Sequence, residues 1–502
     1  MIRRFGLLLA VASILGWAAC GGGGGGNSGT VTSVMVSCSP GTVTSGGTSQ
    51  CTATVTGSGN FNTAVNWSAS GGTINSSGLL TAPTVTTSLL DTVTATSVQN
   101  SSVAGTATVT VNPTSAGSNV APIVVDAGPP NLGYISTNVA FVTVTVCVPG
   151  TNNCQNIDHV MVDTGSFGLR LMSTASGGEL SASFLPQEND SSGNPLDECL
   201  IFLDGYIWGP VQTANVSVAG ESASNVPIQL IIPSSGSPAV PQTCSSQTTG
   251  PNEGDSLGAF GANGILGVGV FPQDCGIACT SQNSSPPDQY YDCPSSGCTP
   301  TFVTIAQQVP NPVSLFTTDN NGVLIQLPSV PDGGSSTVNG SLIFGIGTQS
   351  NNGLGSAQVY GLNDEANFTT NFNGNSYPGF VDSGSNGLFF QDSSIATCPS
   401  PNQEWYCPST SPDNLSAGNQ GTNMNSPVTA NFSIENADNL FSGSNSAFST
   451  LGGTYPGSSP SFDWGLAFFY GQNVFSAIDG AATSGGNGPY YAWGPLTVEA
   501  GP

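Results

Sequence analysis

Short runs in which apolar and polar residues alternate make up the chain beyond its N-terminal segment. Between Thr30 and Asn112 these runs recur about every ten residues, with turn-forming residues between them. The clearest lie at Thr30–Ser37, Cys51–Thr56, Ala64–Ser68, Gly78–Pro83, Thr92–Ser97 and Gly105–Val111. Alternation puts every second side chain on one face of a strand. With Trp67 facing inward and no helical periodicity, the pattern predicts a β-sandwich of about seven strands over residues 30–112.

The longer remainder of the chain is also strand-like. A Pro/Ser/Gly-rich stretch marks a linker over residues 113–120, and apolar runs follow at Val139–Val148, Asp158–Val162, Val226–Ile232, Gly322–Leu327 and Ser341–Phe344. Helical windows are few, and the best are residues 302–308 and 391–396. A mostly β segment spanning residues 121–502 is too large for one simple sandwich. We therefore expect two lobes, at about residues 121–320 and 321–502.

The N-terminus has the features of an export signal. Arg3 and Arg4 precede an apolar stretch, Phe5–Trp17, that is too short to span a membrane and ends at Ala18-Ala19-Cys20. These residues resemble a bacterial lipobox, which implies a signal peptide over residues 1–20, lipid on Cys20 and a glycine-rich tether over residues 21–29. Trp17 stands where lipoboxes usually have leucine, so ordinary cleavage remains an alternative. The expected location is the outer membrane or cell surface, with the lipid as the only membrane contact; the alternative is a periplasmic or secreted protein.

Cysteine content agrees with export. The chain has 13 cysteines, so an even number remains besides Cys20, which predicts disulfides in an oxidising compartment. The closest pairs are Cys38 with Cys51, Cys147 with Cys154, and Cys398 with Cys407. The spacing of Cys275, Cys279, Cys293 and Cys298 also permits a metal site. Disulfides are favoured over a metal because the compartment favours oxidation and because His159 is the only histidine available as a nitrogen ligand, so no metal is expected.

The charge of the chain excludes some partners. Lysine is absent, and 29 acidic residues face Arg170 alone once the signal is removed, a formal charge near −28. Nucleic acid and anionic membranes are therefore poor partners. When the carboxylates protonate, the protein carries almost no charge, which predicts tolerance of acid. A compositional bias of the source organism explains the same numbers equally well.

Two short segments nearly repeat each other. They are Val162-Asp-Thr-Gly-Ser166 and Val381-Asp-Ser-Gly-Ser385, each followed within three residues by Gly-Leu. One copy alone is an ordinary turn, because Asp, Ser and Gly favour turns. Two copies with matched flanks predict that Asp163 and Asp382 meet. Two adjacent carboxyls share one proton, so one can act as base toward water and the other as acid toward a carbonyl oxygen.

Further segments follow in an order that resembles the pepsin-like aspartic proteases. They are Gly261–Gly269, Asn339–Gly345 and Phe462–Phe469, of which the first and last resemble strands that cross beneath the two aspartate loops. The resemblance covers roughly Ala121 to the end. Asp204–Pro210 and Asp319–Val323 are also similar to a family of bacterial exported proteins of unknown function, and Ala64–Pro83 resembles bacterial Ig-like repeats. The fold class implied is mostly β, an Ig-like sandwich followed by a bilobal pepsin-like domain.

The resemblance implies roles for the motif residues. Thr164 and Ser383 would hydrogen-bond across the lobe junction, while Gly165 and Gly384 would permit close backbone approach. Ser166 and Ser385 would donate hydrogen bonds to the outer carboxylate oxygens. No cofactor enters this mechanism. The flap over the substrate corresponds to about residues 200–218, with Phe202 and Tyr206 as candidates for its usual tyrosine, and Arg170 stands where the family commonly has tryptophan. For Arg170, a pairing with a structural carboxylate is favoured over a catalytic part.

We expect from these features a monomeric, exported, acid-acting aspartic-type endopeptidase whose partner is a polypeptide substrate. Two alternatives remain open. One is a pepsin-like scaffold without turnover that binds peptide, glycan or a surface protein. The other is a structural or adhesive surface protein in which both Asp-containing loops are only turns.

Overall fold

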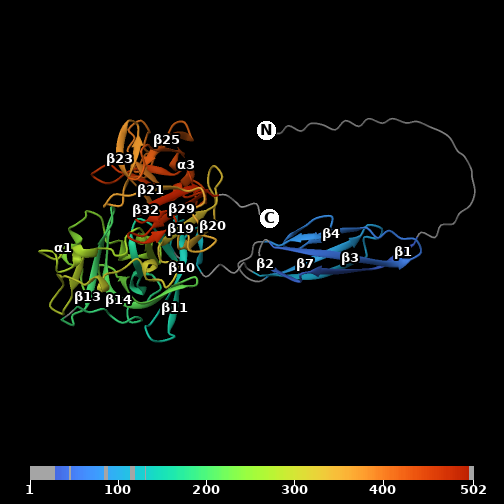
Figure 1. The fold of residues 1–502 in the computed structure, drawn as a ribbon, viewed down its shortest axis with the longest axis horizontal. Helices are drawn as coiled ribbons and strands as arrows, with labels where there is room; N and C mark the ends of the chain where they lie inside the picture. The colour runs from blue at the N-terminus through green and yellow to red at the C-terminus, as the bar shows by residue number, and fades with distance from the viewer. Residues whose placement is uncertain are drawn as a thin grey trace, which may run out of the picture. The chain divides into compact units, whose positions relative to one another are not determined.

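The computed structural model describes residues 29–496, apart from residues 45–46, 84–88, 113–118, 131 and 191. The predicted signal peptide, Cys20 and most of the tether and linker lie outside this range. The chain forms two compact units, Met1–Ser115 and Ala116–Pro502 (Figure 1). No helix in the described ranges is long and apolar enough to cross a membrane.

The N-terminal unit consists of two four-stranded sheets packed face to face. One has the order β1 (Thr30–Ser39), β3 (Thr48–Ser58), β6 (Leu79–Thr81), β5 (Thr73–Ile74), and the other β2 (Thr42–Thr44), β8 (Ala104–Asn112), β7 (Leu89–Ser97), β4 (Val65–Ala69). Val34 and Val55 of the first sheet share a buried cluster with Ala95 of the second, and Trp67 packs against it. The sequence predicted about seven strands and the structure has eight, of which the short β2 and β5 were not among the six runs picked out above. The resemblance to Ig-like repeats stays a prediction.

Asp91 is the one ionisable side chain between Gly29 and Asn112, apart from the cysteines. It is buried in β7, and its carboxylate accepts hydrogen bonds from the Ser70 amide and hydroxyl (3.0 and 2.9 Å), the Gly71 amide (2.8 Å) and the Gly72 amide (2.7 Å). Burial alone would raise the pKa of Asp91, but these donors outweigh it and lower the pKa below the ordinary value. The charged form therefore stabilises the fold.

We expect the stability of this unit to follow the titration of Asp91. Because its folded-state pKa is lowered, the stabilisation is complete above about pH 5 and is lost as the pH falls through the folded-state value. Asp91→Asn should cost about 2 kcal/mol at pH 7 and remove most of the pH dependence. Urea unfolding of residues 29–112, followed by Trp67 fluorescence from pH 2 to 8, measures both. An equally steep pH dependence in the variant would contradict this assignment.

The second unit is built on a large mixed sheet and a smaller one. The 15-stranded sheet has the order β18 (Thr299–Pro300), β17 (Tyr290–Asp292), β13 (Leu196–Ile201), β14 (Tyr206–Val218), β15 (Glu221–Ile231), β12 (Phe167–Met172), β16 (Gly264–Val268), β11 (Cys154–Asp163), β10 (Phe141–Cys147), β9 (Val120–Val125), β20 (Val338–Phe344), β19 (Gly322–Leu327), β29 (Gln472–Ala477), β32 (Tyr490–Pro495), β21 (Gln358–Gly361). The seven-stranded sheet has the order β26 (Val428–Ile434), β25 (Asp413–Gln420), β22 (Phe368–Phe372), β23 (Asn375–Asp382), β28 (Phe462–Gly465), β24 (Leu388–Phe390), β27 (Gly452–Thr454). A two-stranded ribbon joins β30 (Ala482–Thr483) to β31 (Gly486–Asn487).

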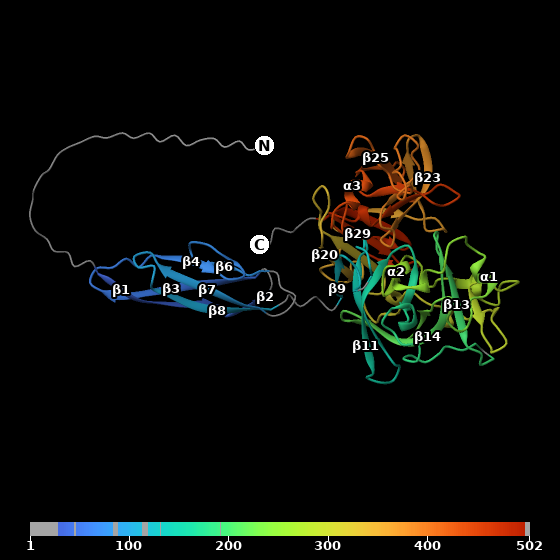
Figure 2. The same cartoon turned by 180° about the vertical axis from the view of Figure 1, so that it is seen from behind.

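The large sheet is continuous between the two predicted lobes. Strand β9, near the start of the unit, pairs antiparallel with β20 of the second half. In Figure 1, β19, β20 and β29 lie between the end that carries β13 and β14 and the end that carries β23 and β25, and Figure 2 shows β20 and β29 in this place from behind. The mostly β class is confirmed, and the arrangement of the sheets is consistent with a bilobal pepsin-like fold.

Helices are short, as the sequence predicts. The α-helices are α1 (Gln242–Ser245), α2 (Leu257–Phe260) and α3 (Ala437–Phe441), and the 3-10 helices are η1 (Thr174–Ser176), η2 (Glu253–Asp255), η3 (Gly276–Cys279), η4 (Ile305–Gln307), η5 (Pro312–Leu315) and η6 (Leu466–Phe468). The window at residues 302–308 contains only η4. The helix expected at residues 391–396 is wrong: the Asp392 carboxylate accepts hydrogen bonds from the Ser394 amide (2.8 Å) and hydroxyl (2.6 Å), which holds a turn instead.

A four-strand pattern occurs twice in this unit. In the first copy β16 runs parallel to β11 and antiparallel to β12, and β15 runs parallel to β12. In the second copy β28 runs parallel to β23 and antiparallel to β24, and β27 runs parallel to β24. The registers match residue by residue, since Asp163 lies opposite Gly267 and Asp382 opposite Gly465. The duplicated motif therefore reflects a duplicated fold.

The described part of the chain contains six disulfides, which is consistent with an exported protein. The three predicted pairs are confirmed, and three further bonds join Cys199 to Cys244, Cys275 to Cys279 and Cys293 to Cys298. The four cysteines that permitted a metal site are therefore all oxidised, as the compartment argument favoured.

Candidate active site

Asp163 and Asp382 lie at the ends of corresponding strands, β11 and β23. Each loop that follows passes over a glycine of the crossing strand, Gly267 in β16 and Gly465 in β28. A Cβ on Gly465 would lie 2.1 Å from the Gly387 carbonyl oxygen, and one on Gly267 would lie 2.6 Å from the Phe167 nitrogen. The crossing strands therefore need glycine at these points so that the aspartate loops can fold down onto them.

Four hydrogen bonds join the two aspartate loops across 219 residues of chain. The Thr164 hydroxyl donates to the Val381 carbonyl (3.0 Å) and accepts from the Ser383 amide (2.9 Å). The Ser383 hydroxyl donates to the Val162 carbonyl (2.8 Å) and accepts from the Thr164 amide (3.1 Å). All four are buried, so the two loops are held in a fixed register.

The glycines of the motifs face the opposite carboxyl. A Cβ on Gly165 would lie 2.7 Å from Cγ and Oδ1 of Asp382, and one on Gly384 would lie 2.6 Å from Oδ1 of Asp163. Any larger residue would push the carboxyls apart. Each glycine amide also donates to the aspartate of its own loop, Gly165 to Asp163 Oδ1 (2.7 Å) and Gly384 to Asp382 Oδ1 (2.8 Å).

The two serines that end the motifs are not equivalent. Ser385 donates to Asp382 Oδ2 (2.9 Å), so that carboxylate accepts two hydrogen bonds within its own loop. The Ser166 hydroxyl lies near Asp163 but is buried without a hydrogen bond of acceptable geometry. Each serine was expected to donate to a carboxylate oxygen of its own aspartate, and in the structure Ser385 does so.

Burial and charge also distinguish the two carboxyls. Asp163 is 5% exposed, while Asp382 is only half-buried. Burial raises the pKa of Asp163 well above its usual value, and the neighbouring charge of Asp382 and a hydrogen bond shared with it raise that pKa further. These causes favour the protonated form of Asp163.

A third carboxyl, which the sequence did not identify, belongs to the same cluster. Asp463 in β28 is 2% exposed, and burial, followed by the charge of Asp382, raises its pKa well above the usual value. The signal in the sequence is a single aspartate in the apolar segment Phe462–Phe469, where the first copy has Ile265. Without the strand registers, nothing placed it next to Asp382.

The two flap candidates lie on the β13–β14 hairpin. Phe202 packs against a cluster of Met172, Ile207 and Ile231, and Tyr206 is buried in the main core. Burial raises the pKa of Tyr206, and a hydrogen bond with Ser234 opposes this shift. Among the described residues, no hydrogen bond joins either side chain to Asp163 or Asp382.

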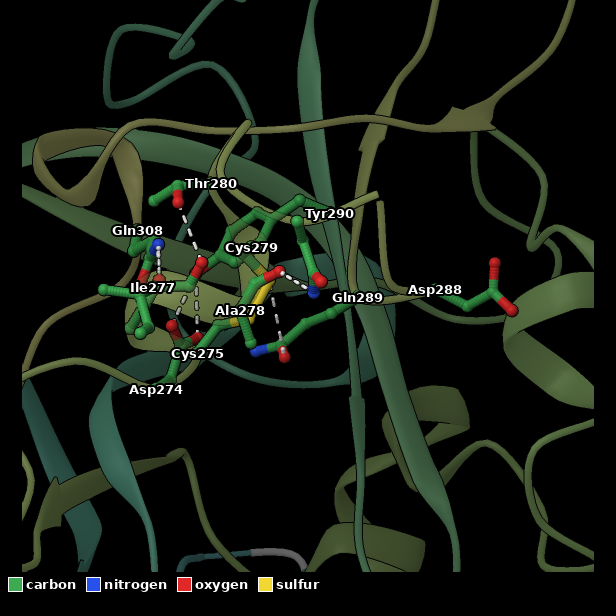
Figure 3. Close-up of a disulfide and its surroundings, with 12 residues drawn as sticks. Asp274, Cys275, Ile277, Ala278, Cys279, Thr280, Asp288, Gln289, Tyr290 and Gln308 are labelled. Carbon is green, nitrogen blue, oxygen red and sulfur yellow. Dashed lines mark hydrogen bonds between the residues drawn. A yellow bond between two sulfur atoms is a disulfide. The ribbon is translucent and has the colours of Figure 1, made fainter. Parts of the chain in front are cut away.

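Arg170 is fully buried and joins three parts of the first lobe. Its guanidinium donates to Glu198 of β13 (2.6 and 3.3 Å), to Asp274 (2.8 Å) and to the Phe167 carbonyl in the loop after Asp163 (2.5 Å). Tyr290 donates to the same Asp274 carboxylate at 2.8 Å. Figure 3 shows Asp274 and Tyr290 beside the Cys275–Cys279 disulfide. Arg170 therefore has the structural carboxylate partners expected from the sequence. Its hydrogen bond to the Phe167 carbonyl also supports the chain that follows Asp163.

A hollow of about 470 Å³ lies elsewhere, beside β22 and β25. It is lined by Asn363, Asn367, Phe368, Thr369, Ser376, Tyr377, Pro378, Gln420, Gly421, Thr422 and Met424. Neither aspartate lines it.

Comparison with known proteins finds one family model and solved structures that match the chain. A family model described as "Protein of unknown function (DUF3443)" matches residues 115–493. No curated relative matches the chain. Among solved structures, the crystal structure of an aspartic proteinase from Irpex lacteus matches with 15% sequence identity and a TM-score of 0.45, covering 75% of this chain and 97% of that chain.

Proposed function

Because the chain belongs to the DUF3443 family, whose function is unknown, we propose its activity from its own geometry: it is an aspartic-type peptidase that hydrolyses peptide bonds at acidic pH. The observation that carries this proposal is the pair of interlocked loops, in which each motif glycine packs on the opposite carboxyl. Such packing, with four hydrogen bonds across the junction, preorganises two carboxyls around one reacting molecule.

The asymmetry of the pair assigns the roles. Asp382, with two hydrogen bonds to its carboxylate and access to solvent, takes a proton from water. The water oxygen then bonds to the peptide carbonyl carbon as Asp163 gives its proton to the carbonyl oxygen. In the second step a proton passes from Asp382 to the amide nitrogen as the C–N bond breaks. A proton from the diol returns to Asp163, so the pair ends as it began.

Other acids of this unit support an acidic working pH. Burial raises the pKa of Asp197 to about 7 and, together with the charge of Asp204, that of Glu253 to about 8. Groups with raised folded-state pKa values stabilise the fold in their neutral form, and this contribution is lost as the pH rises through those values. The unit is thus suited to acid, in agreement with the low charge expected of the chain at low pH.

The test is cleavage of a denatured polypeptide by purified protein between pH 2 and 7, with and without a statine-type inhibitor. We expect cleavage with an acidic optimum, declining toward neutral pH as Asp163 loses its proton, and inhibition by the statine. Folded protein that binds the inhibitor but cleaves nothing would instead support the non-catalytic peptide-binding scaffold. Cleavage that is insensitive to the inhibitor would place the activity outside these loops.

A further inference from the structure

One buried aspartate that the mechanism does not use is Asp197 of β13. It is fully buried, and neither oxygen of its carboxyl has a hydrogen-bond partner among the described residues. The next residue, Glu198, points to the opposite face of the sheet, where it is paired with Arg170 at 2.6 Å. Asp197 takes part in none of the ion pairs of the described residues, and burial raises its pKa to about 7. Below that pH the carboxyl is mostly a neutral acid.

The Asp197 carboxyl lies beside the Cys293–Cys298 disulfide. One of its oxygens and the two sulfur atoms lie within 4.8 Å of one another. The strand register explains this position, because Asp197 lies opposite Tyr291 of β17, and Cys293, two residues further on, shares that face. The Cys293 amide donates to the Pro195 carbonyl at 2.8 Å, which continues the pairing of the two strands up to the disulfide. The backbone therefore holds an acid next to sulfur.

A second disulfide provides a matched comparison. Asp438 lies within the same distance of both sulfurs of Cys398–Cys407. Its side chain is partly exposed and accepts a hydrogen bond from the Asn402 side chain at 2.7 Å. Cys398–Cys407 therefore has a carboxyl nearby, but that carboxyl has a partner and access to water, whereas the carboxyl of Asp197 has neither.

The two sulfurs beside Asp197 differ in their access to solvent. Cys293 is 7% exposed and belongs to the main core, whereas Cys298 is partly exposed. Residues 295–297 of the loop between them are exposed, and this loop joins β17 to β18 at the edge of the large sheet. A thiolate from solvent can therefore reach Cys298, and the buried Cys293 sulfur is the leaving group.

We propose that Cys293–Cys298 is a site of thiol–disulfide exchange with a dithiol, in which Asp197 supplies a proton to the leaving sulfur. One thiolate of the dithiol bonds to the Cys298 sulfur, and the electron pair of the broken S–S bond leaves on the Cys293 sulfur. The Asp197 proton passes to that sulfur, and the carboxylate is later reprotonated from solvent. The second thiolate of the dithiol then bonds to the first sulfur of the dithiol and releases Cys298, which takes a proton from solvent. Two electrons thus pass from the dithiol, which becomes a disulfide, to the protein.

The direction of proton transfer follows from the two acids. An unperturbed thiol has a pKa of about 8.5, and burial raises the pKa of Asp197 only to about 7. The proton is therefore more stable on the Cys293 sulfur. The other ionisable residues on this face cannot replace Asp197, because the pKa of Tyr291 is raised to about 12 and Cys199 is bonded to Cys244.

Reduction of the purified full chain by dithiothreitol tests the site. Samples quenched with acid and alkylated are mapped by mass spectrometry, so that each disulfide is followed separately. We expect Cys293–Cys298 to open about tenfold faster than Cys398–Cys407 at pH 7. Asp197→Asn keeps the shape of the side chain but has no acidic proton, so it should slow this opening by about tenfold. The control Asp438→Asn should leave the opening of Cys398–Cys407 unchanged.

The pH profile separates proton donation from packing. Divided by the concentration of dithiothreitol thiolate, the wild-type rate constant should fall between about pH 6 and about pH 8, because Asp197 loses its proton near pH 7. The profile of Asp197→Asn should be flat. A monothiol, 2-mercaptoethanol, should form its mixed disulfide at Cys298.

Several results would overturn the inference. They are a flat wild-type profile, a Cys293–Cys298 bond that opens no faster than Cys398–Cys407, a mixed disulfide at Cys293, and an unchanged rate in folded Asp197→Asn. The first three are measured on the wild type, so they decide the matter even if the variant does not fold. Peptide cleavage enters none of these measurements, so their outcome is independent of the proposed peptidase function.

Discussion

Asp382→Asn is expected to reduce kcat/KM for peptide cleavage by about 10³-fold or more. An amide cannot take a proton from water, so the attacking oxygen is no longer activated. The asparagine oxygen can still accept from the Gly384 amide, and its NH2 group can donate to the Ser385 hydroxyl oxygen once that hydroxyl turns, so the loop geometry should survive. The measurement is steady-state cleavage of a fluorogenic peptide at the pH optimum, with Asp364→Asn as the matched control from the same lobe.

The same variant should change the titration of the other carboxyl. The charge of Asp382 is one of the causes that raise the pKa of Asp163, so removing that charge should lower the pKa of Asp163. Carbon-13 NMR of the Asp163 carboxyl can follow this shift. Cleavage at wild-type rates in Asp382→Asn would remove the site assignment, and an unchanged Asp163 titration would show that the two carboxyls do not interact.

The position of the aspartate pair could be predicted from the sequence, because each aspartate loop is built by neighbouring residues and the segment occurs twice. The Asp-Ser/Thr-Gly-Ser segments contain the turn formers, the small residue and the hydroxyl groups that build each loop. Two copies were therefore enough to predict that Asp163 and Asp382 lie together. The disulfide between Cys38 and Cys51, like those of the other closely spaced pairs, could be predicted for a similar reason, since a short separation in the sequence restricts the possible partners. The structure brings together the residues that this local reasoning selected.

Features that depend on pairing between distant segments could not be predicted from the sequence. Asp463 occurs in only one copy, and its place on the same face of the sheet as Asp382 follows from the register of β28 between β23 and β24. The continuous sheet through β9 and β20 likewise joins strands from opposite halves of the unit. At residues 391–396 the local signal was itself misleading, because the Asp392 side chain competes for the backbone amide that a helix would use.

Arg170→Met is expected to lower the free energy of unfolding at pH 7 by about 3–5 kcal/mol, because it leaves two buried carboxyls without their cation. Arg170 is fully buried against Glu198 and Asp274. Burial and the charge of Glu198 already raise the pKa of Asp274, and Arg170 opposes this shift. Without the arginine, the charged form of Asp274 should therefore destabilise the fold.

The pH dependence of this loss identifies its cause. Because removal of Arg170 raises the folded-state pKa of Asp274 further, the destabilisation should be largest at neutral pH and should shrink as the pH falls and the acids protonate. Urea unfolding at pH 3 and pH 7 measures the difference, and Arg170→Lys, which keeps the charge but loses the fork of donors, should fall between wild type and Arg170→Met. A triple variant that also carries Glu198→Gln and Asp274→Asn should recover much of the stability at pH 7. An equal loss at both pH values would mean that Arg170 acts through packing of its side chain and not through its charge.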